Sequence, residues 1–254
     1  MIRSRIAQSS TESAPEYRCS ECHDTGWIDI KDADGNRFVR KCSCRLAREA
    51  EERMRASGLG DALKDQNFET FRTETALQEH MKRIAQEYVV DLFDRWDDQR
   101  RPWLFFGGNP GAGKTHICTA VCGEILRHNI GVKYMQWAID SKRLKYSSNE
   151  QVFEDDLNEF IQPTVLYIDD LLKQKYAENP VFTEADIRIA FSILNARYLM
   201  NKPTIISSEW DLINQLLPAD EGVFSRVYER AKNYTVRISR NQEFNYRMRE
   251  EGND

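Results

Sequence analysis

Short apolar runs separated by longer amphipathic stretches dominate the chain after residue 73. Five of these runs have the length and the β-branched or aromatic content of buried strands, at residues 102–106, 132–137, 164–168, 203–209 and 234–238. Over residues 75–98 apolar side chains recur every three or four positions, which predicts a helix, and residues 117–126 and 187–199 also have the pattern of helices. The pattern therefore predicts a chain in which strands and helices alternate.

The loop after the first of these strands contains the motif G-x-x-x-x-G-K-T, between a buried strand and a buried helix. Its glycines allow backbone N–H groups to surround an anion, and the following helix adds its free N–H groups and the positive end of its dipole. Lys114 is expected to contact the β- and γ-phosphates, and the Thr115 hydroxyl is expected to ligate Mg²⁺. The candidate nucleotide-binding residues are Gly108, Asn109, Pro110, Gly111, Ala112, Gly113, Lys114, Thr115 and His116.

Two adjacent carboxylates end the apolar run at residues 164–168. This is the Walker B pattern, in which Asp169 holds Mg²⁺ opposite Thr115. Asp170 stands where many such ATPases have a glutamate that polarises the attacking water. Its side chain is shorter than that of glutamate, so it has less reach toward a water molecule at the γ-phosphate.

Six cysteines fall into two groups. Cys19, Cys22, Cys42 and Cys44 bracket two short alternating segments, 26–30 and 37–40, around the turn signal Asp34-Gly35-Asn36. A hairpin brings its two ends together, so the four thiolates can form a closed Zn²⁺ site, and without an export signal a disulfide framework is disfavoured. Unliganded cysteines are the alternative. Cys118 and Cys122 are expected in the core.

Composition limits the remaining possibilities. The 254 residues carry a net charge of −5, a hydrophobic fraction of 41% and a mean hydropathy of −0.66, which is typical of a water-soluble protein. No apolar run reaches the roughly 18 residues that a membrane span needs, and residues 1–13 lack the apolar segment of a secretory signal, so a cytoplasmic protein with no membrane role is expected. Nucleic-acid binding would require a local basic surface. Residues 142–146 could form one, with a solvated helix face as the alternative.

The motifs together resemble the bacterial and phage helicase-loader ATPases of the DnaC/DnaI type, AAA+ proteins related to the IstB transposition helpers. The resemblance is carried by C-x-x-C-H-D-T-G-W with C-S-C, G-N-P-G-A-G-K-T-H, V-L-Y-I-D-D-L, P-T-I-I-S-S-E and S-R-V-Y-E-R. It implies an α/β fold, a three-layer αβα AAA+ core with a parallel sheet. We expect a flexible tail at 1–13, a four-cysteine zinc module at 14–47, a helical linker at 48–72, and an ATPase core without a full lid at 73–254.

The resemblance also implies roles for individual residues. Lys114, Asp169 and Asp170 would serve ATP hydrolysis, with Ser208 in the sensor position that contacts the γ-phosphate. The family often has asparagine at the next position, where this chain has Glu209. Arg226 matches the arginine finger that reaches the γ-phosphate of a neighbouring subunit, with Arg230 a weaker candidate on the same helix and Arg247 as a possible second sensor.

The implied function is that of an ATP-dependent loader with ATP, Mg²⁺ and Zn²⁺ as its ligands. Such a protein binds a hexameric replicative DNA helicase through the zinc module, self-associates through Arg226, and places the helicase on single-stranded DNA. One alternative is an IstB-like transposition helper that acts on duplex DNA. Another is a zinc adaptor protein that binds nucleotide but does not hydrolyse it.

Overall fold

The computed structural model describes residues 17, 19–31, 35–98, 100–173, 182–241 and 245–246, and inside the first helix it describes only the backbone of residues 46, 47, 50, 51, 53 and 54. The chain forms two compact units, residues 1–51 and 52–254. The expected tail at 1–13, the turn residue Asp34 and the candidate Arg247 lie outside the described residues.

The first unit is built on an antiparallel hairpin. Strand β1 (Trp27–Lys31) pairs with β2 (Arg37–Lys41), with Trp27 opposite Lys41 and Lys31 opposite Arg37. Both strands lie within one residue of the predicted segments. Helix α1 (Ser43–Ala56) begins directly after Cys42 and continues past residue 47, so the predicted boundary between module and linker stays a prediction.

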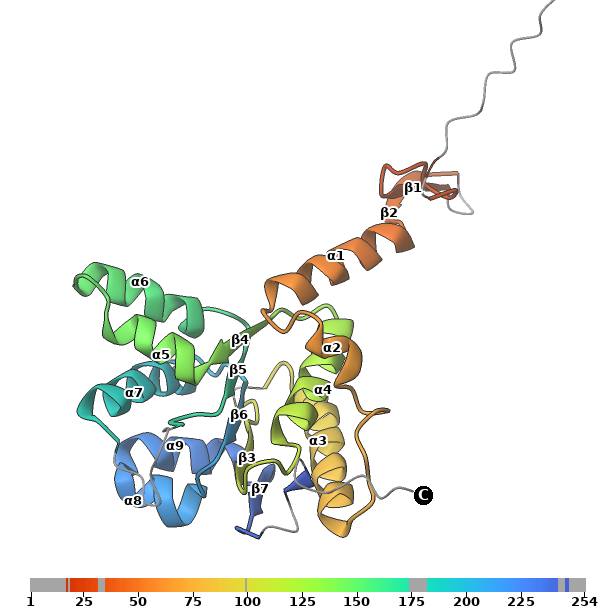
Figure 1. Cartoon of the computed structure of the whole chain (residues 1–254). Coiled ribbons are helices and arrows are strands. Elements are labelled where there is room, and N and C mark those ends of the chain that lie inside the picture. The colour runs from red at the N-terminus through yellow and green to blue at the C-terminus, as the bar shows by residue number, and fades with distance from the viewer. Residues whose placement is uncertain are drawn as a thin grey trace, which may run out of the picture. The chain divides into compact units, whose positions relative to one another are not determined.

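The second unit contains a five-stranded parallel sheet in the order β4-β5-β6-β3-β7 (Figure 1). The sequence pattern predicted all five strands, which are β3 (Leu104–Gly108), β4 (Val132–Gln136), β5 (Val165–Asp169), β6 (Thr204–Ser208) and β7 (Thr235–Ile238). β3, β5 and β6 are buried along their whole length, because helices cover both faces of the sheet. This gives the predicted three-layer α/β architecture.

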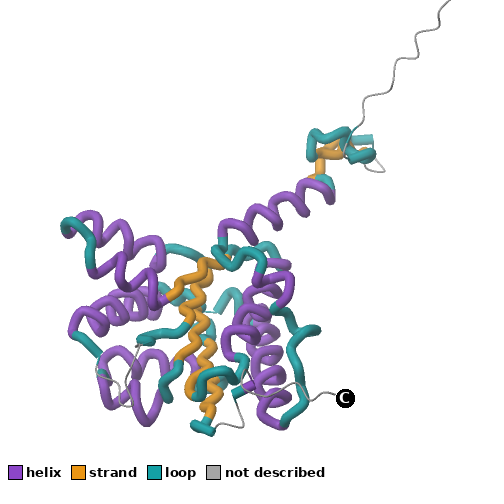
Figure 2. The backbone as a smooth tube through the Cα atoms, in the orientation of Figure 1, coloured by secondary structure: helices purple, strands orange, loops and turns teal. Residues whose placement is uncertain are grey.

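The two faces of the sheet support separate halves of the core. Helices lie on both sides of the sheet (Figure 2). Leu104 and Phe106 of β3 pack with α3 and α4 on one face, whereas Phe105 lies with α5, α6, α7 and α9 on the other. The helices are α2 (Ala62–Asp65), α3 (Ala76–Asp94), α4 (Lys114–Arg127), α5 (Trp137–Lys145), α6 (Glu150–Ile161), α7 (Glu184–Leu199), α8 (Leu217–Ala219) and α9 (Glu221–Ala231), with one π-helical turn, η1 (Leu212–Leu216). Cys118 and Cys122 are fully buried in this core, as predicted.

Helix α3 ends earlier than its apolar pattern suggested. Thr75 and Gln78 form a capping box at its start, where the prediction placed it. The prediction ran to Asp98, but the helix ends at Asp94, and the Trp96 carbonyl accepts a hydrogen bond of 2.7 Å from Arg101 Nε. This side-chain contact satisfies a carbonyl outside the helical ladder and turns the chain toward β3. None of the helices in the described part of the chain is long and apolar enough to cross a bilayer.

Candidate nucleotide site and cysteine cluster

The phosphate-binding motif occupies the turn between β3 and α4. Gly108, Gly111 and Gly113 all have positive φ angles, of 113°, 75° and 87°. A Cβ atom on Gly108 would lie 1.9 Å from the Ile238 carbonyl oxygen, so β7 requires glycine there. Asn109 is buried, and its N–H donates to the same carbonyl at 3.1 Å. The turn is therefore fixed against the sheet.

Lys114 begins α4 and is buried at the centre of this turn. Its Nζ donates to the carbonyls of Gly108 at 2.9 Å and Asn109 at 2.8 Å. Burial lowers the pKa of Lys114 to about 8, and the negative charges of Asp170 and Glu209 act in the opposite direction. A poorly solvated cation at this position favours an anionic ligand.

Asp169 ends β5 and accepts hydrogen bonds from four hydroxyl groups. Its Oδ1 accepts from Thr115 at 3.1 Å, Tyr167 at 2.7 Å and Ser207 at 2.5 Å, and its Oδ2 accepts from Tyr134 at 2.9 Å. The structure thus brings Thr115 and Asp169 together, as the motif spacing predicted. The other three hydroxyls were not identified from the sequence.

Strand pairing explains two of these unexpected contacts. Tyr134 of β4 pairs with Tyr167 of β5, and their rings lie 5.3 Å apart. Ile168 pairs with Ile206, so the next residues, Asp169 and Ser207, are neighbours. Alternation along β5 would have placed Tyr167 on the same face as Asp169. The contacts of Tyr134 and Ser207 with Asp169 depend on strand order, which the sequence does not reveal.

Asp170 directly follows β5 in a left-handed conformation, with φ of 55°. Its N–H donates to Ser207 Oγ at 3.0 Å, and its Oδ2 lies 2.7 Å from Lys173 Nζ. Burial raises the pKa of Asp170, while the Lys173 ammonium acts in the opposite direction. Its proposed role in activating water stays a prediction.

The sensor candidate Ser208 ends β6 and is fully buried. Its hydroxyl donates to the Leu171 carbonyl at 2.9 Å and accepts from the Trp210 N–H at 3.1 Å. Both contacts bind it to the protein interior, and Ser207, not Ser208, contacts Asp169. The next residue, Glu209, lies 3.1 Å from Lys173 Nζ. The expected contact between Ser208 and the γ-phosphate stays a prediction.

His116, the last residue of the motif, contacts the segment before α3. His116 Nε2 lies 3.1 Å from the Asn67 carbonyl oxygen and 3.3 Å from Thr70 Oγ1, and its ring meets Phe71 edge to face at 5.2 Å. Burial lowers the pKa of His116. Phe71 is buried against the turn, so it packs as an anchor for this segment. Ala112 is also buried, whereas Pro110 is exposed.

The two arginine candidates on α9 differ in their surroundings. Arg226 is half-buried, donates to the Gly222 carbonyl, and lies over the rings of Phe191 and Tyr198. Arg230 instead donates to Asn201 Oδ1 at 2.9 Å and to the Tyr198 carbonyl at 3.1 Å, which ties it to the end of α7. Arg230 is accounted for by packing, so Arg226 remains the better candidate.

The basic segment 142–146 lies at the end of α5, and most of its charge is neutralised. Arg143 pairs with Asp156 and Glu159, each at 2.8 Å, and Lys145 pairs with Asp186 at 2.5 Å. Tyr146 is 85% exposed. The ion pairs favour the solvated helix face over a surface for nucleic acid.

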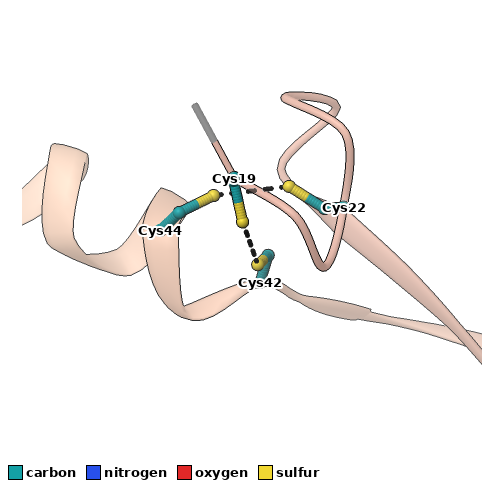
Figure 3. A group of neighbouring side chains, drawn as sticks. All are labelled: Cys19, Cys22, Cys42 and Cys44. Atoms are coloured by element: carbon teal, nitrogen blue, oxygen red, sulfur yellow. Dashed lines mark hydrogen bonds between the residues drawn. The ribbon is translucent and has the colours of Figure 1, made fainter. Parts of the chain in front are cut away.

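The four N-terminal cysteines converge at the base of the hairpin (Figure 3). The ligand sulfur atoms all lie within 4.8 Å of one another, with 3.7 Å between Cys19 and Cys42 and 3.4 Å between Cys22 and Cys44. Tetrahedral zinc with bonds of about 2.3 Å would place its sulfurs about 3.8 Å apart, so the spacing fits this metal. The four thiols titrate together: although burial opposes it, the Gly26 N–H and the neighbouring thiols lower the pKa of Cys22 to about 7, whereas the hydrogen bond with Cys22 raises the pKa of Cys44.

A family model described as IstB-like ATP binding protein matches residues 34–248. The chain belongs to this family. It is 33% identical over 241 residues to the phage-like element PBSX protein XkdC of Bacillus subtilis (strain 168), covering 93% of this chain and 88% of that one. It is 28% identical over 121 residues to the replicative helicase loader DnaC of Escherichia coli (strain K12), covering 45% of this chain and 46% of the relative.

Comparison of structures supports the fold assignment. The crystal structure of DnaI superposes with a TM-score of 0.54 at 19% identity, covering 70% of this chain and 92% of that one. At this identity the match shows a shared fold, and the predicted AAA+ architecture is confirmed. The chain is thus an IstB-like ATP-binding protein with homology to helicase loaders, and its four cysteines are placed to hold a metal ion.

Proposed function

We propose that this protein is an ATP-dependent helicase loader. In this proposal it binds a hexameric replicative DNA helicase through the four-cysteine module and places it on single-stranded DNA in the cytoplasm, with ATP binding and hydrolysis as the switch. The convergence of Cys19, Cys22, Cys42 and Cys44 in a chain with an AAA+ fold carries the proposal. The resemblance implies that such a module is found in several loaders, whereas IstB-like helpers generally lack it. The similarity to a protein named as a replicative helicase loader supports it.

The nucleotide site supports the ATPase part of the proposal. Lys114 and the N–H groups of the glycine-rich turn would bind the phosphates of ATP. The Thr115 hydroxyl and an Asp169 oxygen lie 3.1 Å apart, and two hard oxygen donors fit Mg²⁺. When bound, Mg²⁺ would neutralise charge on the β- and γ-phosphates. The hydroxyls around Asp169 fix its carboxylate in one orientation.

The cysteine module would use zinc for structure. Four sulfur ligands leave no open position for a substrate, so a metal bound here is not a catalytic one. A hairpin of this size buries too little apolar surface to be stable alone, and metal binding would supply the missing free energy. A rigid hairpin surface is what a protein partner would recognise.

Self-association is proposed through Arg226. An arginine finger from one subunit would reach the γ-phosphate held by the next, a contribution of roughly 10³–10⁵ in rate for related phosphoryl transfers. We expect Arg226→Ala to retain ATP binding and to lose the turnover that increases with protein concentration. Arg188→Ala, at an exposed position on α7, is the control. Equal turnover in Arg226→Ala and wild type would remove this assignment.

Co-purification tests the loader assignment. The full chain is mixed with a hexameric replicative helicase, beside a Cys19→Ser/Cys22→Ser variant and a Ser20→Ala control at the exposed position between them. Binding by the wild type and the control, and its loss in the cysteine variant, is expected. A wild-type protein that does not bind the helicase would contradict the proposal.

A second candidate is a transposition helper that acts on duplex DNA, favoured by the family match over residues 34–248. Stimulation of ATP turnover by duplex DNA, without helicase binding, would select it. The third candidate, a zinc adaptor that binds nucleotide without hydrolysis, is tested by Lys114→Ala: equal turnover in this variant and wild type would mean that this site does not hydrolyse ATP.

A further inference from the structure

Two acidic side chains from neighbouring strands meet beside the nucleotide site. Strands β5 and β6 lie side by side in the sheet (Figure 1) and pair in parallel. Asp170 follows β5 and Glu209 follows β6, so both residues leave the sheet at the same edge. Lys173 Nζ lies 2.7 Å from Asp170 Oδ2 and 3.1 Å from Glu209 Oε1. One ammonium group therefore holds two carboxylates that would otherwise repel each other.

Each carboxylate keeps one oxygen available. Among the described residues, neither Asp170 Oδ1 nor Glu209 Oε2 has a hydrogen-bond partner. Their side chains are 26% and 23% exposed, so water reaches them from one side. Asp170 directly follows Asp169, and its N–H donates to the same Ser207 hydroxyl that donates to Asp169 Oδ1. Because Asp169 Oδ1 also lies 3.1 Å from the Thr115 hydroxyl, the acidic pair adjoins the two candidate Mg²⁺ ligands.

We propose that Glu209 is a catalytic residue that, together with Asp170, orients the water that attacks the γ-phosphate. This inference rests on the proposed ATPase function. Asp170 and Glu209 each give one oxygen to Lys173 and keep the other, but the Glu209 side chain is one methylene longer and so has the longer reach. Lys173 is the positioning residue that keeps both carboxylates at this place.

In the proposed step, a water molecule held by the two carboxylates attacks the γ-phosphate. The water oxygen forms a bond to the γ-phosphorus, and the bond from that phosphorus to the β–γ bridging oxygen breaks, with its electron pair leaving on ADP. One water proton passes to the free oxygen of Glu209 and from there to solvent, so that the products are ADP, phosphate and a released proton. Asp170 accepts the second hydrogen of the water as a hydrogen bond.

A purely structural interpretation makes a different prediction. A partly exposed ion-pair network such as Asp170–Lys173–Glu209 contributes little to stability, and its loss has no reason to affect the chemical step. A catalytic carboxylate instead changes kcat and leaves nucleotide binding nearly intact, because its contribution is made in the transition state. A lower kcat with unchanged nucleotide affinity therefore distinguishes a catalytic role from a structural one.

The experiment compares Glu209→Gln, Asp170→Asn and the double variant with wild type, and uses Glu154→Gln on the exposed face of α6 as the matched control. ATP turnover is measured at high protein concentration with single-stranded DNA, and Mg²⁺-ATP affinity is measured separately by titration. We expect Glu209→Gln to lower kcat on the order of 10²-fold with affinity and melting temperature unchanged. Because both carboxylates act on one water, the double variant is expected to be no slower than the slower single variant.

Other results would overturn the inference. Unchanged kcat in Glu209→Gln, while Lys114→Ala abolishes turnover, would reject Glu209 and leave the ATPase proposal standing. A parallel loss of affinity and melting temperature in Glu209→Gln would assign it a structural role. If the wild type has no turnover that depends on Lys114, the ATPase proposal fails and this inference fails with it.

Discussion

Arg197 is a fully buried arginine that holds together the starts of two central strands. Its five N–H groups lie within hydrogen-bond distance of six oxygens, those of the Thr204 side chain and of the carbonyls of Phe160, Ile161, Pro163, Thr164 and Pro203. Three of these carbonyls share the two hydrogens of Nη1. These carbonyls belong to the end of α6 and to the residues just before β5 and β6. The same two strands end in Asp169 and Ser208, so Arg197 supports the candidate site from the opposite edge of the sheet.

Replacement of Arg197 by methionine is expected to destabilise the second unit strongly. Five N–H donors at about 1 kcal/mol each amount to about 5 kcal/mol of hydrogen bonding. Part of this loss is offset, because the variant no longer buries a charge and methionine fills part of the volume. We therefore expect the free energy of unfolding to fall by about 3 kcal/mol, because the carbonyls that lose their donor remain buried. In a unit of this size this corresponds to a melting temperature lower by about 6–12 °C.

Urea unfolding followed by far-ultraviolet circular dichroism measures this effect. The control is Arg188→Met on the exposed side of the same helix, for which a change within about 0.5 kcal/mol is expected. Arg197→Lys should recover only a small part of the loss, because an ammonium cannot reproduce the planar fork of donors. If Arg197→Met unfolds at the same urea concentration as the wild type, the hydrogen bonds of Arg197 to these carbonyls do not stabilise the fold, which would refute this prediction.

Three further predictions concern the candidate sites. The pKa of Lys114 is about 8 in the folded protein, below its usual 10.5, so between these pH values the unfolded chain binds more protons than the folded one. The free energy of unfolding should therefore rise with pH from about 8 to 10.5. Lys114→Met should abolish this rise in urea titrations. Tyr134→Phe removes one of four hydroxyls on Asp169 and should raise the Mg²⁺ concentration needed for half-maximal turnover several-fold, with an unchanged melting temperature; an unaltered Mg²⁺ dependence would contradict it. Elemental analysis should find one zinc per chain in the wild type and a substoichiometric amount in Cys42→Ser, and a metal-free wild type would contradict the cluster assignment.

The sequence predicted the contacts that follow from local chain geometry. A strand, a glycine-rich turn and a helix place Lys114 and Thr115 at the carboxyl edge of a sheet, and a second strand that ends in Asp169 reaches the same edge if the sheet is parallel. Likewise, a hairpin brings Cys19 and Cys42 together whatever the rest of the chain does. In each case the spacing along the chain is sufficient to define the neighbours.

Contacts that depend on strand order could not be predicted. Nothing in the apolar runs indicates that β5 lies between β4 and β6, yet this order gives Asp169 the hydroxyls of Tyr134 and Ser207. The neutralisation of residues 142–146 has the same origin. Lys145 pairs with Asp186, 41 positions away, because α5 and α7 cover the same face of the sheet.

Strand order also changes the meaning of two departures from the family pattern. Taken separately, aspartate in place of glutamate at position 170 and glutamate in place of asparagine at position 209 each argue against efficient hydrolysis. Once β5 and β6 are neighbours, the two side chains share Lys173, and the reach that Asp170 lacks is available from Glu209. The two substitutions are then complementary, because the shorter carboxylate at position 170 is accompanied by a longer carboxylate at position 209.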